Sequence, residues 1–194
     1  MTKLLYCVRH GTALHNSLFK TMGPKAYYKF RDTPLINEGI LDAIKLRKTW
    51  NEKNNIQLVV VSPLSRALRT ADIVFKNTQI PIIVLDELKE FPQSGQLINY
   101  RQDTTIMKIL YPNFDFSNII MTSDKDWNNK ELPKKINIHK LNKQITQFEN
   151  WIKNRPEKKI AVVGHSSYFN MMMNNFIDNE ESELKHCFPY LYEL

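Results

Sequence analysis

The chain has 194 residues, of which 42% are hydrophobic and 24% are charged, as in an ordinary globular protein. This length predicts a single domain over residues 1–194, and no apolar run approaches the roughly 20 residues of a membrane span, so we expect no membrane partner. The net charge of +7 comes from scattered lysines without a recognisable nucleic-acid module, so we expect no nucleic-acid partner either.

The start of the chain and its two cysteines indicate an intracellular protein. Met1-Thr2-Lys3 leads directly into the first predicted strand and leaves no room for a signal peptide. Cys7 lies inside that strand and Cys187 lies near the other end of the sequence, so they form neither a disulfide framework nor a metal-ligand spacing. We therefore expect a cytoplasmic location.

A short apolar run over residues 4–8 predicts a buried strand that is followed by Arg9 and His10. In open α/β sheets, ligands bind outside the carboxyl ends of the strands. One interpretation is that Arg9 holds an anion and His10 is a nucleophile, and the other is that both are ordinary loop residues. Asn16, a few residues later, either donates its amide hydrogens to an oxyanion in the same pocket or caps a turn.

A second apolar run, residues 58–61, precedes a predicted helix with Ser62 as its N-cap and Pro63 at its first position. Arg66 then lies in the first turn, off the buried stripe of that helix. An arginine there opposes the helix dipole unless it shares an anion with the free backbone N–H groups. We therefore favour an anion-binding role for Arg66 over a solvated surface position.

Two further predicted strands also end in polar residues. The strand over 80–85 runs into an acidic turn in which Glu87 or Glu90 is the candidate general acid, because a phosphate beside a carboxyl group raises its pKa. A solvated acidic turn is the alternative. The strand over 160–164 is followed by His165.

The remaining segments complete an α/β pattern. Strands that alternate with helices predict a mainly parallel sheet covered on both faces. Trp127 anchors a long polar segment or lines the pocket. The other expected elements are amphipathic helices over 40–50 and 138–152, an irregular loop over 21–33, a helix over 94–108 at the mouth of the pocket, a possible lid over 94–135, and an edge strand over 188–194.

Because the carboxyl ends of parallel strands meet at one edge, the sequence predicts a cationic pocket with an acid at its rim. Arginine forks bind phosphate oxygens in pairs, and a neutral imidazole attacks phosphorus. This combination favours a small phosphate monoester as the substrate. The residues brought together would be Arg9, His10, Arg66, His165 and one of the two glutamates.

These residues lie in motifs that resemble the histidine phosphatase superfamily, also called the phosphoglycerate mutase-like family. The segments around Asn16 and 114–117 are most similar to its broad-specificity phosphatase branch. The matching motifs run in family order: Arg9-His10-Gly11, Asn16, Asp32-Thr33-Pro34-Leu35 with Gly39, Ser62-Pro63-Leu64-Ser65-Arg66-Ala67 with Thr70-Ala71, and Val162-Val163-Gly164-His165-Ser166.

The resemblance implies a three-layer α/β/α sandwich and a phosphatase that works through a phosphohistidine intermediate without a metal or other cofactor. It implies that His10 is the nucleophile and that Glu90, in preference to Glu87, is the general acid and base. It also implies a catalytic role for His165, which would hold the phosphoryl group together with Arg9, Arg66 and Asn16.

Three features depart from the family pattern. Ile36 stands where a Thr or Ser usually caps a helix, so we expect Asn37 or Thr33 to cap it instead. Ser167 replaces a common glycine, which would narrow the phosphate pocket. The Gly-x-Trp-Glu-Gly segment of the mutases is missing after Glu90.

Three other functions stay open. A phosphoglycerate-type phosphomutase would share the phosphohistidine, and a catalytically inactive binding protein would share the scaffold. The short chain and the missing mutase segment favour hydrolysis. Gly164-His165-Ser166-Ser167 also resembles a serine nucleophile elbow, for which Asp178 and His186 would complete a triad. The sequence specifies neither the phosphorylated substrate nor the oligomeric state.

Overall fold

The computed structural model describes residues 2–91, 95–124, 138–179 and 181–194. Its centre is a five-stranded sheet with the strand order β3-β2-β4-β1-β5. The first four strands in the chain are mutually parallel, and the last is an antiparallel edge strand on β1. The strands are β1 (Leu4–Arg9), β2 (Leu58–Val61), β3 (Ile82–Val84), β4 (Lys159–Gly164) and β5 (Pro189–Glu193). The predicted mainly parallel sheet is therefore confirmed.

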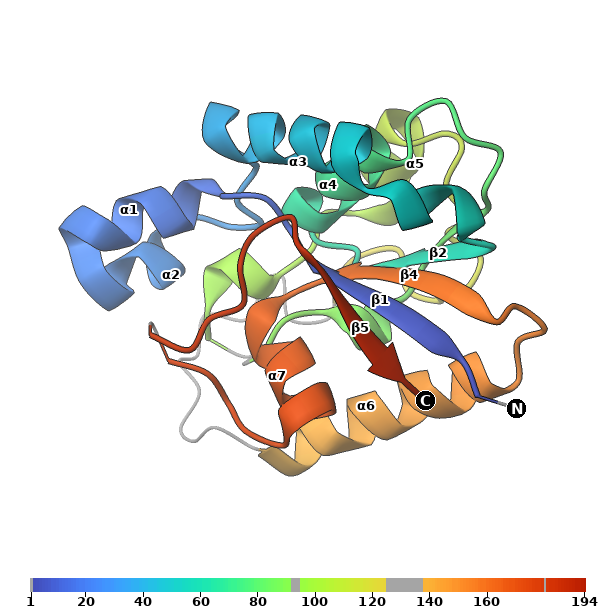
Figure 1. Ribbon diagram of the computed structural model, residues 1–194. Helices are drawn as coiled ribbons and strands as arrows, with labels where there is room; N and C mark the ends of the chain where they lie inside the picture. Colours follow the sequence, from blue (N-terminus) through green and yellow to red (C-terminus); the bar gives the residue numbers. More distant parts are fainter. Residues whose placement is uncertain (1, 92–94, 125–137, 180) are drawn as a thin grey trace.

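Helices cover both faces of the sheet and make three layers (Figure 1). One face carries α3 (Asn37–Thr49), α4 (Ser65–Val74) and α5 (Thr104–Leu110), and the other carries α6 (Ile138–Lys153) and α7 (Ser166–Asn174). Successive side chains of a strand point to opposite faces. Accordingly, Val59 and Val61 join the core under α3 and α4, whereas Leu58 and Val60 join the core under α6 and α7.

Shorter elements surround the carboxyl edge of the sheet. Helix α1 (Leu14–Met22), the 3₁₀ turn η1 (Gly23–Lys25) and α2 (Ala26–Lys29) project beyond β1 (Figure 1). The other 3₁₀ turns are η2 (Asn51–Asn55), η3 (Asp86–Leu88) and η4 (Leu97–Asn99). No helix in the described part of the chain has both the length and the apolar character needed to cross a bilayer.

Two sequence expectations about helices are wrong. The segment 21–33 contains η1 and α2, so it is not an irregular loop throughout. A single helix over 94–108 does not form, because residues 100–103 stay extended between η4 and α5. This extension lets the buried Arg101 side chain pair with Asp86 over 2.8 Å and donate to the carbonyl oxygens of Met121 and Thr122, while Asp103 caps α5.

The starts of α3 and α4 also differ from expectation, because the side chains predicted to cap them form hydrogen bonds elsewhere. Helix α4 begins at Ser65, and its N-terminus is capped from outside by Asp32, whose carboxylate accepts from both N and Oγ of Ser65 over 2.7 Å. The Ser62 hydroxyl, predicted as the N-cap, instead contacts His165. Helix α3 has no side-chain cap, and the Thr33 hydroxyl pairs with the His15 ring.

The loop after β1 is held against α3 through two glycines that touch. A Cβ atom built on Gly11 would lie 2.4 Å from the Gly39 oxygen, and one on Gly39 would lie 2.2 Å from the Thr12 oxygen. Ile36 N donates to Thr12 O at the same place over 3.1 Å. This close backbone approach fixes the position of the residues that follow β1.

Only part of the predicted lid over 94–135 lies within the described residues. Residue 94 and residues 125–135, with Trp127, fall outside them. Of the described part, Gln96 and Ile98 line the cavity beside His10.

Candidate active site

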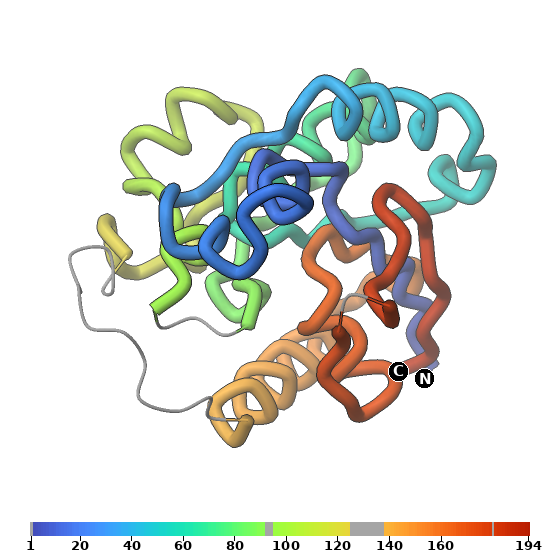
Figure 2. The backbone as a smooth tube through the Cα atoms, turned by 90° about the vertical axis from the view of Figure 1, so that its left-hand side faces the viewer, coloured from blue at the N-terminus to red at the C-terminus, as the bar shows by residue number. Residues whose placement is uncertain are grey.

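A cavity of about 350 Å³ opens at the carboxyl edge of the sheet. Figure 2 views the molecule from this side, with α1 and α2 in blue, the segment after β3 in green and the segment after α7 in red. These elements supply its walls. The lining residues are Arg9, His10, His15, Asn16, Phe19, Pro24, Tyr27, Arg66, Glu90, Phe91, Gln96, Ile98, Ser167, Ile177, Asp178, Asn179 and Glu183.

His10 lies between a backbone carbonyl and an arginine. Its Nδ1 is 2.7 Å from Gly11 O, a contact that requires the proton on Nδ1. Its Nε2 accepts a hydrogen bond from Arg66 Nε over 3.2 Å. Burial, followed by the charges of Arg66 and other neighbours, holds the pKa of His10 well below its usual value. The imidazole is therefore neutral at neutral pH, with its lone pair on the nitrogen that faces Arg66.

Arg66 is 1% exposed, so it is not the solvated surface residue of the alternative interpretation. Its Nη1 donates to Ile98 O over 2.7 Å and its Nη2 donates to Asn99 Oδ1 over 2.9 Å. Burial lowers the pKa of Arg66 to about 10, so the guanidinium keeps its charge at neutral pH. The first turn of α4 thus presents a fixed cation beside His10.

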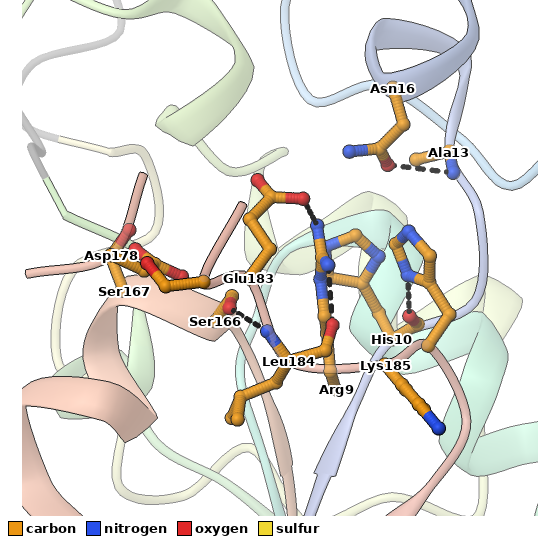
Figure 3. Close-up of polar contacts among 12 residues, drawn as sticks. Arg9, His10, Ala13, Asn16, Ser166, Ser167, Asp178, Glu183, Leu184 and Lys185 are labelled. Carbon is orange, nitrogen blue, oxygen red and sulfur yellow. Dashed lines mark hydrogen bonds and ion pairs between the residues drawn. The ribbon is translucent and has the colours of Figure 1, made fainter. Parts of the chain in front are cut away.

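Arg9 is also buried, and its guanidinium is held by the segment that follows α7. Nη2 donates to Glu183 Oε2 over 2.7 Å, and Nη1 donates to Leu184 O over 2.6 Å (Figure 3). The third nitrogen, Nε, is buried and has no hydrogen-bond partner among the described residues. Arg9 therefore holds an anionic oxygen of the protein itself at the cavity wall.

His165 follows β4 and is fully buried. The centroid of its ring is 5.2 Å from that of His10, and its Nε2 is 2.7 Å from Ser62 Oγ. Its Nδ1 has no partner within the described residues. Burial, followed by the charge of Arg66, holds the pKa of His165 well below its usual value, so its ring is neutral as well. The His165 ring thus lies next to that of His10, and His165 is not among the residues that line the cavity.

Glu90 lines the cavity, whereas Glu87 lines a different hollow with Arg101 and Lys143. The Glu90 carboxylate accepts from the backbone N–H groups of Ser167 (3.3 Å) and Tyr168 (3.1 Å) at the start of α7. Burial, with a further contribution from the charge of Asp178, raises the pKa of Glu90 to about 7. A carboxyl group with this pKa can both give and take a proton near neutral pH.

Asn16 fits both of its sequence interpretations. Its Oδ1 accepts from the Ala13 backbone N–H over 3.0 Å and so caps α1 (Figure 3). The same side chain lines the cavity. Because the carbonyl oxygen makes the cap, the amide NH₂ is the part available to an oxyanion.

A known family model matches nearly the whole chain. Residues 5–189 match the model of the histidine phosphatase superfamily, branch 1. The chain belongs to this superfamily. Phosphoglycerate mutase-like protein 1 of Arabidopsis thaliana is 26% identical over 204 residues, which cover 89% of this chain and 71% of the relative. A probable phosphatase of Schizosaccharomyces pombe is 27% identical over 173 residues, which cover 84% and 74%.

Solved structures of phosphatases share the fold. The alpha-ribazole phosphatase from Shigella flexneri superposes with a TM-score of 0.59 at 20% identity, covering 87% of this chain and 77% of that chain. The phosphoserine phosphatase from Entamoeba histolytica superposes with a TM-score of 0.57 at 18% identity, covering 97% and 94%. The predicted phosphoglycerate mutase-like fold is thereby confirmed.

Four residues near His10 were not predicted as part of a phosphate site. His15 and Asp178 line the cavity, Glu183 binds Arg9, and His186 Nδ1 lies 2.6 Å from His10 O. Burial, with the charge of Arg9, lowers the pKa of His186 to about 4. Three of the four come from the segment after α7, which has no periodic pattern from which its path could be predicted.

The serine hydrolase alternative is not supported by the geometry. Ser166 Oγ accepts from the Leu184 backbone N–H over 2.7 Å, and His186 bonds to the His10 carbonyl. These residues form no triad. In the described ranges, no group of three or more His, Cys, Asp or Glu side chains is arranged to hold a metal ion.

Proposed function

We propose that this protein is a phosphatase that hydrolyses a small phosphate monoester through a phosphohistidine intermediate. The observation that carries the proposal is the contact between Nε2 of a neutral His10 and the charged Arg66, at the wall of a cavity that Glu90 also lines. A neutral imidazole nitrogen is a competent nucleophile toward phosphorus, and a guanidinium beside it stabilises the charge of a phosphoryl group.

In the first step, His10 Nε2 attacks phosphorus and the bond from phosphorus to the ester oxygen breaks. Glu90, in its protonated form, donates its proton to the leaving oxygen. Arg9, Arg66 and the Asn16 amide hold the phosphoryl oxygens, and His165 lies beside the His10 ring. The arginines supply the positive charge, so the proposal requires no metal ion.

In the second step, Glu90 is a carboxylate and takes a proton from water. The water oxygen bonds to phosphorus, the bond from phosphorus to His10 Nε2 breaks, and inorganic phosphate leaves. A pKa of about 7 suits both roles, because the two protonation states are then similarly populated near neutral pH.

The proposal is tested by trapping the intermediate. The enzyme is mixed with a ³²P-labelled monoester, denatured within milliseconds and analysed for protein-bound label. We expect a label that survives alkali and is lost in acid, as a phosphoramidate requires, and that is absent from His10→Asn. The matched control is His139→Asn, because His139 is exposed on α6, far along the chain from the cavity residues. Phosphate release without any protein-bound label, or label retained by His10→Asn, would overturn the proposal.

A further inference from the structure

The cavity proposed to accept a phosphate is lined by carboxylates as well as by cations. Arg9 and Arg66 are its only lysine or arginine residues within the described part of the chain, and both adjoin His10. Two carboxylates, Asp178 and Glu183, stand in the same wall. Once a phosphoryl group occupies the two arginines, no described lining cation is left for a second anionic group of the substrate.

Asp178 is positioned as a fixed anion. Its Oδ2 accepts from Asn170 Nδ2 over 3.2 Å, and it makes no ion pair with a described lysine or arginine. Asn170 is 1% exposed, so the donor that orients the carboxylate belongs to the buried side of α7. Asp178 and Glu90 line the same cavity, and the charge of Asp178 contributes to the raised pKa of Glu90. This carboxylate therefore lies near the group that serves the leaving oxygen.

A second wall of the cavity is aromatic. The rings of Phe19 and Tyr27 stack with centroids 5.2 Å apart and planes at 27°, and both line the cavity. Aromatic faces attract ammonium groups through their quadrupole, and carboxylates attract them through charge. Both features of the cavity beyond the phosphoryl site thus favour a cation and disfavour an anion.

From this arrangement we propose that the substrate is the phosphate monoester of an amino alcohol, with an ammonium group near Asp178 and no second anionic group. This inference rests on the proposed phosphatase activity and specifies the leaving group of the same site. It also states what the site rejects, because a carboxylate or a second phosphate on the leaving group would face Asp178 without a compensating described cation.

The test uses three two-carbon esters that differ chiefly in charge, namely 2-aminoethyl phosphate, 2-hydroxyethyl phosphate and phosphoglycolate, with p-nitrophenyl phosphate as a general substrate. We expect kcat/KM to fall from 2-aminoethyl phosphate through 2-hydroxyethyl phosphate to phosphoglycolate. The difference between the first and the last should be on the order of tenfold, because the carboxylate of phosphoglycolate is repelled by Asp178. Asp178→Asn should bring the kcat/KM values for 2-aminoethyl phosphate and phosphoglycolate together. Glu181→Gln, which removes the same charge from an exposed position of the same segment, should preserve the ratio.

The ratio of two esters within one variant is informative because any effect of Asp178 on Glu90 acts on both esters and cancels. Three results would overturn the amino alcohol assignment, provided that p-nitrophenyl phosphate is still hydrolysed. They are equal kcat/KM for the three esters, a preference for phosphoglycolate, and an unchanged ratio in Asp178→Asn. Failure to hydrolyse any of the four esters would instead overturn the phosphatase activity itself, and the assignment with it.

Discussion

Arg66 Nε donates a hydrogen bond to His10 Nε2 over 3.2 Å, so in the absence of substrate the guanidinium occupies the lone pair of the proposed nucleophile. The arriving phosphoryl group must take this donor from His10. Burial first, and then the charge of Arg66, lower the pKa of His10 and keep the imidazole neutral. One guanidinium thus prepares the nucleophile and then stabilises the charge that develops on phosphorus.

Arg66→Lys should lower kcat/KM for p-nitrophenyl phosphate on the order of 100-fold, because an ammonium group cannot present the directed fork that reaches His10, Ile98 and Asn99 together. Steady-state kinetics would measure the change. Arg69→Lys is the matched control, since Arg69 is exposed one turn along α4 and pairs with Asp72. Equal losses in the two variants would contradict a specific role for Arg66.

The raised pKa of Glu90 predicts that the rate of hydrolysis depends on pH. Its pKa is raised to about 7, so the carboxyl group is protonated and able to serve as an acid below that pH, and kcat/KM for an alkyl phosphate should fall as the pH rises through about 7. Glu90→Gln should remove this limb and lower kcat/KM for the alkyl ester by roughly 100-fold or more. A p-nitrophenyl ester, whose leaving group needs no proton, should lose less.

Glu87→Gln provides the control for this experiment, because Glu87 follows the same strand, three residues after the end of β3, but lies in a different hollow. We expect its pH profile and its rates on both esters to match those of the unmodified enzyme. A pH limb that persists in Glu90→Gln, or disappears in Glu87→Gln, would show that another group supplies the proton.

Glu183 holds Arg9 through an ion pair of 2.7 Å, and its side chain is 36% exposed. A phosphoryl group competes with this carboxylate for the same guanidinium, so Glu183→Gln should bind inorganic phosphate more tightly, by about threefold for a partly exposed pair. Product inhibition measures this affinity directly. Weaker phosphate binding in Glu183→Gln, with Glu181→Gln unchanged, would mean that Glu183 orients Arg9 instead of competing for it.

The close contact between Gly39 and Thr12 predicts that a larger residue at position 39 destabilises the protein. An alanine Cβ there would lie 2.2 Å from Thr12 O and 2.5 Å from Thr12 N, which are backbone atoms that cannot rotate away. Gly39→Ala should therefore lower the free energy of unfolding by about 2 kcal/mol, as urea denaturation followed by circular dichroism would report. Glu38→Ala changes the exposed neighbouring position of α3 and is expected to have little effect. Similar losses in both variants would argue against the glycine contact.

The main lines of this fold were predictable from the sequence because they depend on local pattern. Runs such as Val59-Val60-Val61 and Ala161-Val162-Val163 are buried on both faces, and that composition is typical of parallel strands between helices. Since parallel strands end at one edge, the positions of Arg9, His10, Arg66 and His165 relative to the sheet also followed. The ordered motifs then identified the superfamily, which the family model confirms.

Tertiary structure decided what no local pattern encodes. Glu87 and Glu90 differ little in sequence context, yet of the two only Glu90 reaches the first turn of α7, because Glu87 lies within the turn η3 and Glu90 follows it. Asp32 caps α4 from a distant part of the chain, whereas Thr33 pairs with His15 and leaves α3 without a side-chain cap. Asp178, Glu183 and His186 come from a segment without periodicity. Its path is fixed by contacts with β1 and α7, so long-range packing alone brought these side chains to His10.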